Sequence, residues 1–266
     1  MSDFWKTAIS RVKPNEILVR GYPIEQLTRR CSFGEVVFLL LRGELPRRNE
    51  GKLVEAMLVA VCDHSLASPS ADAVRFVASS GVPLQTAVAA GVSAIGEVHG
   101  GAIEPCAKLL REAVAQGLNA DEIFARLKRE GQRLAGFGHP VHQRDPRTAV
   151  LLAIADELQL SGPHTKLACQ LEEQSQRCAG KRLPLNVDGA IAALMCDVGI
   201  CPALGKAFFI IGRAPGYVAH AHEQMTQERP FKAVSPREIT YTGPARRDVK
   251  KGGKSPPSRK AGGSNS

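Results

Sequence analysis

Three histidines and one aspartate lie beside glycine, proline or acidic residues, at the ends of stretches that we expect to be helical. His64 lies in Cys-Asp-His-Ser, His99 in Val-His-Gly-Gly-Ala, His139 in Gly-Phe-Gly-His-Pro and Asp188 in Leu-Asn-Val-Asp. Imidazole titrates near neutral pH and a carboxylate accepts protons, so this set predicts general acid–base chemistry. Helix N-termini offer free N–H groups, which favours an anionic substrate. A histidine at a helix end can also be a simple cap, and that alternative stays open for each.

Two histidine pairs have spacings that match a metal site only in part. His139 and His142 are three residues apart, and His220 and His222 are two residues apart. Residues two apart do not share a helix face, and the glutamate of a His-Glu-x-x-His motif is missing. We therefore expect no metal, and we expect His220 and His222 to be surface or interhelix hydrogen-bonding groups.

The composition of the 266 residues is that of a globular chain, with 44% hydrophobic and 23% charged residues. The apolar runs are shorter than the ~20 residues of a membrane span, and we expect neither a span nor a secretory signal. The seven cysteines are scattered and include no Cys-x-x-Cys pair. They indicate free thiols in a reducing compartment, and hence a cytoplasmic location.

The net charge of +9 comes mainly from the end of the chain. Residues 244–266 contain seven basic residues and one acidic residue, together with glycine, serine and proline. This composition offers almost nothing to bury and is typical of a disordered tail. No aromatic residue lies among the basic ones to stack on a nucleic-acid base, so we do not expect nucleic-acid binding as the main function.

Helical periodicity dominates the chain up to residue 226. Ser32 with Glu35 matches a capping box, in which each side chain accepts a backbone N–H of the other residue. The apolar stripe of the helix after Asn49 is expected to extend to Leu66, and the last helix is expected to break near Pro215. Asn49, Asn119 with Glu122, and Asp145 are expected to cap the helices that follow them. The other expected helices lie between Pro69 and Gly81, from Pro83, from about Ala102, and over 164–178, 189–198 and 203–226.

Two short segments, Glu16–Arg20 and Glu238–Thr242, are expected to be extended. We expect them to pair and so to join the two ends of the folded part. The sequence contains no strand–helix–strand alternation, which argues against a Rossmann-type sheet. The predicted fold class is mainly α with a small β element near the chain ends.

Seven short motifs follow one another along the chain: Arg20-Gly-Tyr-Pro, Ser32-Phe-Gly-Glu, His99-Gly-Gly-Ala, Gly136-Phe-Gly-His, Asp145-Pro-Arg, Asn186-Val-Asp and Gly212-Arg. In this order they resemble the citrate synthase superfamily over roughly residues 5–242. Cys62-Asp-His, Leu185-Asn-Val-Asp-Gly and Phe209-Ile-Ile-Gly-Arg are most similar to its citryl-CoA lyase branch, which includes the C-terminal part of ATP-citrate lyase.

The resemblance implies a citrate-synthase-like helical fold with two domains, in a homodimer. Residues 1–105 and 191–243 would form the large domain, and residues 106–190 the small domain. The active site would lie in the cleft between them. Residues 244–266 would remain a disordered basic tail.

The resemblance also implies three catalytic roles. His99 matches the histidine that hydrogen-bonds the thioester carbonyl and stabilises the enol form. Asp188 matches the carboxylate that exchanges a proton with the methyl group of acetyl-CoA. His139 matches the histidine that handles the proton on the oxo-acid carbonyl or, in reverse, on the citryl hydroxyl.

Seven more residues have binding roles implied by the same resemblance or by their positions near the motifs. Arg229 matches an arginine that the family donates across the dimer interface. The candidates for binding substrate carboxylates are His64, Arg147, Arg213 and Arg229. The candidates for binding the phosphates of coenzyme A are Arg144, Lys181 and Arg182.

The leading hypothesis is an enzyme of tricarboxylic acid metabolism that cleaves citryl-CoA, or a related 3-hydroxy-acyl-CoA, to acetyl-CoA and oxaloacetate. An alternative is the forward condensation, as in a citrate or 2-methylcitrate synthase. A second alternative is a non-catalytic or a partner-dependent acyl-CoA-binding subunit, for which a CoA-ligase-type protein is the candidate partner. Ile103 follows His99-Gly-Gly-Ala where synthases commonly have asparagine, which favours the lyase branch.

Overall fold

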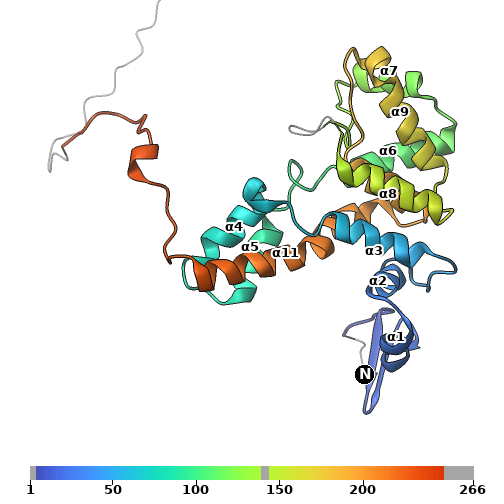
Figure 1. Cartoon of the computed structure of the whole chain (residues 1–266), viewed down its shortest axis with the longest axis horizontal. Coiled ribbons are helices and arrows are strands. Elements are labelled where there is room, and N and C mark those ends of the chain that lie inside the picture. Colours follow the sequence, from blue (N-terminus) through green and yellow to red (C-terminus); the bar gives the residue numbers. More distant parts are fainter. Residues whose placement is uncertain (1–3, 139–143, 249–266) are drawn as a thin grey trace, which may run out of the picture. The chain divides into compact units, whose positions relative to one another are not determined.

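The computed structural model describes residues 4–138 and 144–248 (Figure 1). The strands are β1 (Ser10–Lys13), β2 (Glu16–Val19) and β3 (Tyr22–Pro23). The α-helices are α1 (Ile24–Arg30), α2 (Phe33–Arg42), α3 (Glu50–Ala60), α4 (Pro69–Ala78), α5 (Leu84–Ser93), α6 (Ile103–Gln116), α7 (Ala120–Arg129), α8 (Pro146–Glu157), α9 (Pro163–Ala179), α10 (Val187–Asp197) and α11 (Gly205–Gln227). Short 3₁₀ helices are η1 (Ser65–Ala67), η2 (Pro202–Leu204) and η3 (Pro236–Glu238).

The chain up to Lys232 forms one compact unit, and the residues from Ala233 form a second, small unit that contains η3. Within the two described ranges, no helix combines the length and the apolar character that crossing a bilayer requires. The mainly helical fold class with a small sheet is confirmed.

The three strands form one antiparallel sheet in the order β1, β2, β3. Lys13 lies opposite Glu16, so only two residues separate the first two strands. Closing so short a turn costs far less chain entropy than joining the two ends of the folded part. The expected pairing of Glu16–Arg20 with Glu238–Thr242 is wrong: Glu238 ends η3, where its carboxylate accepts the N–H of Ser235 at 3.3 Å, and residues 239–242 form no strand.

Local side-chain caps start α2 and α7 as predicted. Ser32 Oγ accepts the N–H of Glu35 at 3.3 Å, and the Glu35 carboxylate accepts the N–H of Ser32 at 2.8 Å. Asn119 and Glu122 form the same reciprocal pair at 3.1 and 2.8 Å. These bonds satisfy N–H groups that a helix start leaves without intrahelical partners.

Two details of α3 differ from the expectation. Asn49 precedes α3 but forms no side-chain cap bond, and its φ of −97° and ψ of 13° lie outside the extended region that an N-cap residue usually adopts. The helix ends at Ala60, so Leu66 lies in η1 and does not extend the apolar stripe of α3.

The expected break at Pro215 is also wrong, because α11 continues through it from Gly205 to Gln227. A proline inside a helix removes one backbone hydrogen bond and would normally end or bend it. Arg213 and Tyr217, on either side, are both buried, and α11 packs along α3, α4 and α5. Tertiary packing therefore maintains the helix across the proline.

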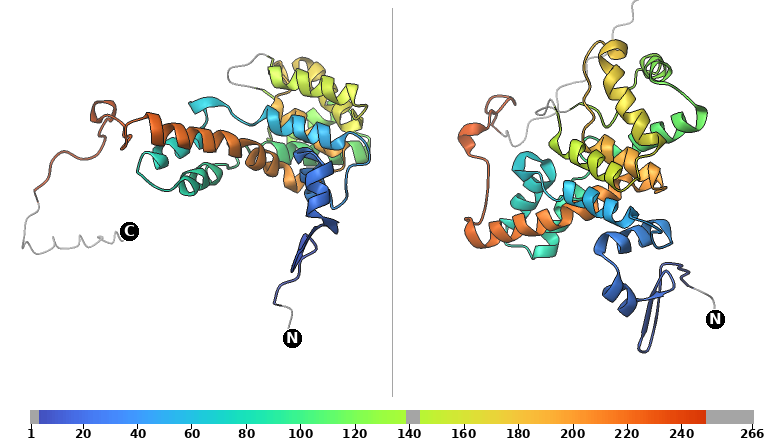
Figure 2. Two further views of the ribbon diagram at one scale, coloured as in Figure 1. Left: turned by 60° about the horizontal axis from the view of Figure 1, so that its bottom comes forward. Right: turned by 45° about the vertical axis from the view of Figure 1, so that its right-hand side comes forward.

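Helix α11 connects two hydrophobic cores, as Figures 1 and 2 show. The smaller core lies between α4, α5 and α11 and includes Val74, Ala87 and Tyr217. The larger core lies among α6 to α10 and includes side chains from α2, α3 and the first part of α11, such as Phe208 and Phe209. Segments from both groups of helices therefore meet near the middle of α11.

Asp197, at the end of α10, holds the start of α9. Its side chain is only 1% exposed. Its carboxylate accepts the backbone N–H groups of Gly162, His164 and Thr165, each at 3.0 Å. It is also bonded to His164 Nδ1 at 2.7 Å and accepts the Thr165 hydroxyl at 2.6 Å.

We expect Asp197→Ala to lower the free energy of unfolding by about 3 kcal/mol or more, because several buried donors lose their acceptor at once. Urea unfolding followed by circular dichroism measures this loss. Asp156→Ala, which removes an exposed carboxylate from α8, is the matched control and should change stability little. Equal effects of the two substitutions would contradict the role of Asp197.

Candidate active site

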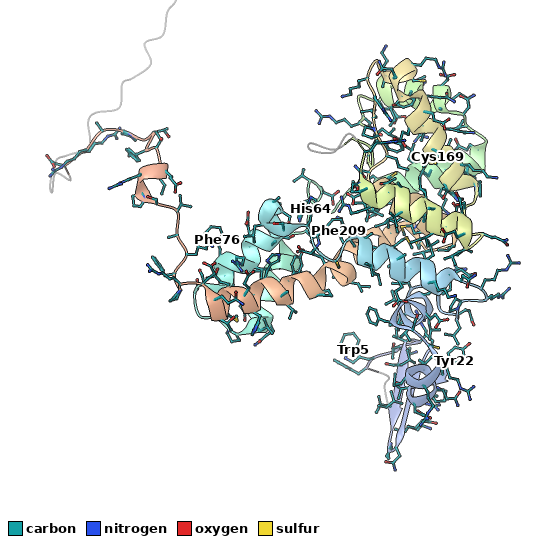
Figure 3. All side chains as sticks on the ribbon, viewed as in Figure 1. Trp5, Tyr22, His64, Phe76, Cys169 and Phe209 are labelled. Atoms are coloured by element: carbon teal, nitrogen blue, oxygen red, sulfur yellow. The ribbon has the colours of Figure 1, made fainter. Side chains whose placement is uncertain are left out.

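A pocket of about 230 Å³ brings together five residues from five stretches of chain that lie far apart in the sequence. Its wall includes the loop before η1, the turn before α6, the starts of α8 and α10, and the first half of α11. Figure 3 shows His64 and Phe209, two residues of this wall, near each other. The site residues from the sequence analysis that line it are His64, His99, Arg147, Asp188 and Arg213.

Two glycines allow the loop before His139 to lie against the start of α10. Gly136 has a φ of 81°, and a Cβ on Gly189 would collide with the Gly136 carbonyl oxygen. The Gly138 N–H donates to Pro184 O at 2.7 Å, and Gly138 lines the pocket. His139 and His142 themselves lie outside the described residues.

Asp188 lies in the first turn of α10, where Asn186 is the N-cap. Asn186 Oδ1 accepts the N–H groups of Asp188 and Gly189 at 3.0 and 3.1 Å. Burial raises the pKa of Asp188 to about 6, although the charges of Arg147 and Arg213 oppose the shift. The carboxyl group can therefore both give and take a proton near neutral pH.

His99 is held in a tight turn in which the N–H of Gly96 donates to its carbonyl oxygen at 2.9 Å. Its Nε2 is bonded to Ser70 Oγ at 2.8 Å, and its ring meets the edge of Phe209 at 6.0 Å between centroids. Burial and the nearby charges of Arg213 and His64 lower the pKa of His99. The ring is therefore neutral at neutral pH, and Nδ1 is the nitrogen left to meet a ligand.

Arg213 is almost completely buried, with 1% of its surface exposed. Its Nε donates to Val61 O at 2.6 Å, and its guanidinium carbon lies 4.8 Å from the centre of the Phe209 ring. Its Nη1 is buried and has no hydrogen-bond partner among the described residues. A buried guanidinium N–H without an acceptor is costly, and an anion in the pocket would supply one.

Arg147 is oriented by Asp145, the N-cap of α8. Its Nε and Nη2 donate to the two carboxylate oxygens at 2.9 and 2.8 Å, and the same carboxylate accepts the N–H of Val187 at 3.1 Å. Burial alone would raise the pKa of Asp145, but the bonds and charge of Arg147 outweigh it and lower that pKa. The two-point contact fixes the guanidinium and ties α8 to α10.

A second pocket, of about 850 Å³, shares Gly138 with the first. Among the residues lining it are three basic ones, Lys128, Arg133 and Lys181, and the aromatic rings of Phe124 and Phe137. Of the three residues expected to hold phosphates, Lys181 lines this pocket. Arg144 and Arg182 are exposed and belong to the lining of neither pocket.

Arg229 lies outside both pockets on an exposed segment just after α11. Its backbone is fixed, because the buried Gln224 donates from Nε2 to Arg229 O at 3.1 Å. Two residues later, the N–H of Phe231 donates to Ser79 O at 2.7 Å. The arginine is therefore presented at a defined point on the surface of the chain.

Sequence reasoning missed the residues that support the site from outside the motifs. Ser70 resembles any serine near a helix start, and only the fold brings it to His99. Lys128 lies in α7 and Arg133 lies just after it. In the sequence, neither can be distinguished from an ordinary charged surface residue. Of the supporting residues, only Phe209 could have been found from the sequence, because it begins the motif that ends at Arg213.

In the parts of the chain that the structure describes, no three metal-binding side chains gather into a possible metal centre. His220 hydrogen-bonds Asp63 at 3.0 Å, in agreement with its expected role, and His222 is exposed.

Comparisons with known proteins identify the family of the chain. The family model for the citrate synthase C-terminal domain matches residues 3–56 and 47–236. The chain belongs to the citrate synthase family. The citrate synthase of Helicobacter pylori strain J99 is 30% identical over 85% of this chain, and the match spans 53% of that protein. The chain thus covers about half the length of this curated relative.

Two solved structures are similar to the chain over most of its length. The citryl-CoA lyase of Hydrogenobacter thermophilus is 42% identical with a TM-score of 0.89, covering 93% of this chain and 98% of the other. The ATP citrate lyase of Methanothrix soehngenii, solved in complex with citrate and coenzyme A, is 25% identical with a TM-score of 0.83, covering 91% of this chain and 42% of the other.

We expect Asp188→Asn to stabilise the fold at pH 8. The pKa of Asp188 is raised from 3.8 to about 6, so its ionised form costs the folded state stability above pH 6. A neutral amide avoids this cost, which corresponds to about 2–3 kcal/mol. Urea unfolding should show the gain at pH 8, a smaller gain between pH 6 and 4, and none below about pH 3.8. A gain that does not change with pH would contradict the raised pKa.

Proposed function

We propose that this chain cleaves citryl-CoA to acetyl-CoA and oxaloacetate. The observation that carries the proposal is the pocket itself, which combines a carboxyl group with a pKa near 6, a neutral histidine and a buried arginine with an unpaired N–H. The 42% identity to a citryl-CoA lyase supports citryl-CoA as the substrate over a different acyl-CoA.

The carboxylates of the citryl group would be bound by cations in the pocket. Arg213 offers its free Nη1, and Arg147 offers Nη1, since its Nε and Nη2 already bind Asp145. His64 completes this side of the wall. Guanidinium groups suit carboxylates because they donate two parallel hydrogen bonds.

The cleavage is a retro-Claisen step. A base, which we propose is His139, takes the proton of the citryl hydroxyl. The carbon–carbon bond then breaks, giving the carbonyl of oxaloacetate and the enolate of acetyl-CoA. His99 donates a hydrogen bond from Nδ1 to the thioester oxygen, where the negative charge gathers. Asp188, in its protonated form, gives a proton to the former methylene carbon and completes acetyl-CoA.

Coenzyme A would occupy the larger pocket. Lys128, Arg133 and Lys181 offer positive charge for its phosphates, and the two phenylalanine rings offer an apolar surface. We propose Arg144 and Arg182 as additional, solvent-exposed phosphate contacts. Gly138 lines both pockets, and we propose that the thioester arm extends past it to His99 and Asp188.

The test is a coupled assay in which purified protein receives citryl-CoA, and malate dehydrogenase with NADH reports oxaloacetate. We expect turnover by the wild type and a loss of at least about 100-fold in Asp188→Asn, because the proton donor is removed. Surviving turnover in that variant would contradict the role of Asp188.

Two other results would replace the proposal. Thiol release from acetyl-CoA and oxaloacetate, without citryl-CoA cleavage, would identify a citrate synthase or, with propionyl-CoA, a 2-methylcitrate synthase. Turnover only after addition of a CoA-ligase-type protein would identify a partner-dependent subunit.

We also propose a cytoplasmic homodimer in which residues 106–190 form the small domain and Arg229 reaches the partner's pocket. The support is that Gln224 and Ser79 fix the backbone around Arg229 while its side chain stays exposed and away from its own pocket. A twofold dimer would place the same contact at both sites.

Subunit complementation tests this arrangement. Asp188→Asn and Arg229→Ala should each be inactive alone. Unfolding them together and refolding should restore about a quarter of wild-type activity, because each mixed dimer has one intact site. No recovery, with mixed dimers demonstrated by mass spectrometry, would show that Arg229 does not act across the interface.

A further inference from the structure

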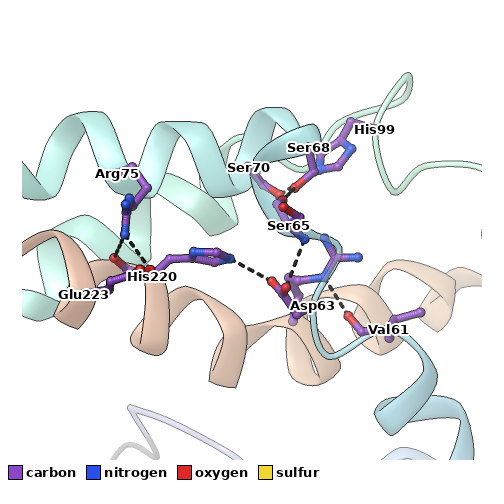
Figure 4. Close-up of polar contacts among 10 residues, drawn as sticks. Val61, Asp63, Ser65, Ser68, Ser70, Arg75, His99, His220 and Glu223 are labelled. Atoms are coloured by element: carbon purple, nitrogen blue, oxygen red, sulfur yellow. Dashed lines mark hydrogen bonds and ion pairs between the residues drawn. The ribbon is translucent and has the colours of Figure 1, made fainter. Parts of the chain in front are cut away.

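The segment 61–65 carries His64 into the pocket wall and lies directly on α11 (Figure 4). Val61 O accepts Nε of Arg213 at 2.6 Å. Gly216, one turn further along α11, leaves no room for a Cβ because the Cys62 carbonyl oxygen lies against it. The chain thus meets α11 at successive residues just before His64.

Asp63 makes the last of these contacts and also shapes the residue after His64. Its Oδ1 is bonded to Nε2 of His220 at 3.0 Å, and its Oδ2 accepts the N–H of Ser65 at 2.9 Å. Ser65 has a φ of 57°, a left-handed conformation that a serine rarely adopts without support. Ser68 Oγ donates to Ser65 O at 3.3 Å and holds the other side of the turn.

The carboxylate of Asp63 is ionised in this setting. Burial alone would raise its pKa, but the N–H of Ser65, the His220 ring and the N–H of His64 outweigh burial and lower it. The N–H of His64 and the N–H of Ser65, which lie on either side of the His64 side chain, therefore both interact with the Asp63 carboxylate.

His220 is in turn fixed from the opposite side by α4. Arg75 is buried, and its Nη1 donates to His220 O at 3.3 Å and to the Glu223 carboxylate at 2.8 Å (Figure 4). Its Nη2 lies 3.6 Å from Glu228. The donor in the contact to Asp63 thus lies on α11, which Arg75 ties to α4.

We propose that Asp63 and His220 are positioning residues that hold His64 in place to bind a carboxylate of the substrate. The inference rests on the proposed function, in which His64 contacts the citryl group. Neither residue lines the pocket. Their effect passes through the left-handed turn at Ser65, which sets the direction in which His64 leaves the chain.

The test compares Asp63→Ala, His64→Ala and the double variant in the citryl-CoA assay. A misplaced binding group weakens substrate affinity, so we expect KM to rise by about 10- to 100-fold with kcat changed far less. Because Asp63 acts through His64, the double variant should be no worse than His64→Ala alone. His220→Ala should behave like Asp63→Ala, and Asp63→Asn, which keeps an oxygen for Ser65, should recover much of the affinity.

His222→Ala is the matched control, since His222 is an exposed histidine on the same helix. It should leave KM unchanged. Effects of Asp63→Ala and His64→Ala that multiply in the double variant would overturn the proposal, as would an unchanged KM in Asp63→Ala.

A crystal structure of Asp63→Ala separates this inference from the proposed function. A displaced His64 with Ser65 out of the left-handed region supports the positioning role even if the wild type does not cleave citryl-CoA. An unmoved His64 refutes that role whatever the activity.

Discussion

One buried guanidinium group, that of Arg213, is the constraint that the rest of the pocket must satisfy. Arg213 is 1% exposed, and taking such a charge out of water is costly unless every donor finds a partner. Val61 and Phe209 meet part of that need, and the remaining Nη1 is left for a ligand. The same charge lowers the pKa of His99 and opposes the rise at Asp188. An anion bound in the pocket would therefore supply the hydrogen-bond acceptor that Arg213 Nη1 lacks.

Two titratable groups in the pocket are moved in directions that favour their neutral forms. His99 loses affinity for its proton while Asp188 gains it, and burial is the largest cause in both cases. The result is a neutral imidazole and a carboxyl group that ionises near pH 6, next to fixed cations. The net positive charge in this wall thus comes from arginine, which does not titrate in this range. The proposed mechanism therefore assigns proton transfer and anion binding to different side chains.

Local features were predictable, and features that depend on distant packing were not. The capping boxes at Ser32 and Asn119 involve residues three apart, so the sequence alone contains the whole interaction. The strand pairing and the helix through Pro215 were predicted wrongly, because loop entropy and tertiary packing decided them. In the site, five of the predicted residues, including His99 and Asp188, line one pocket. The contact of Ser70 with His99 could not be predicted, because nothing near Ser70 in the sequence indicates it.

The side chain of Asn186 makes both a helix-cap contact and a loop contact. Its Oδ1 caps the start of α10, and its Nδ2 donates to the carbonyl oxygen of Gly138, a residue that lines both pockets, at 2.8 Å. Pulling the Gly136–Gly138 loop away would strain the cap, and losing the cap would release the loop. A substitution that removes the Asn186 side chain would therefore loosen both the loop beside the two pockets and the first turn of α10, which carries Asp188.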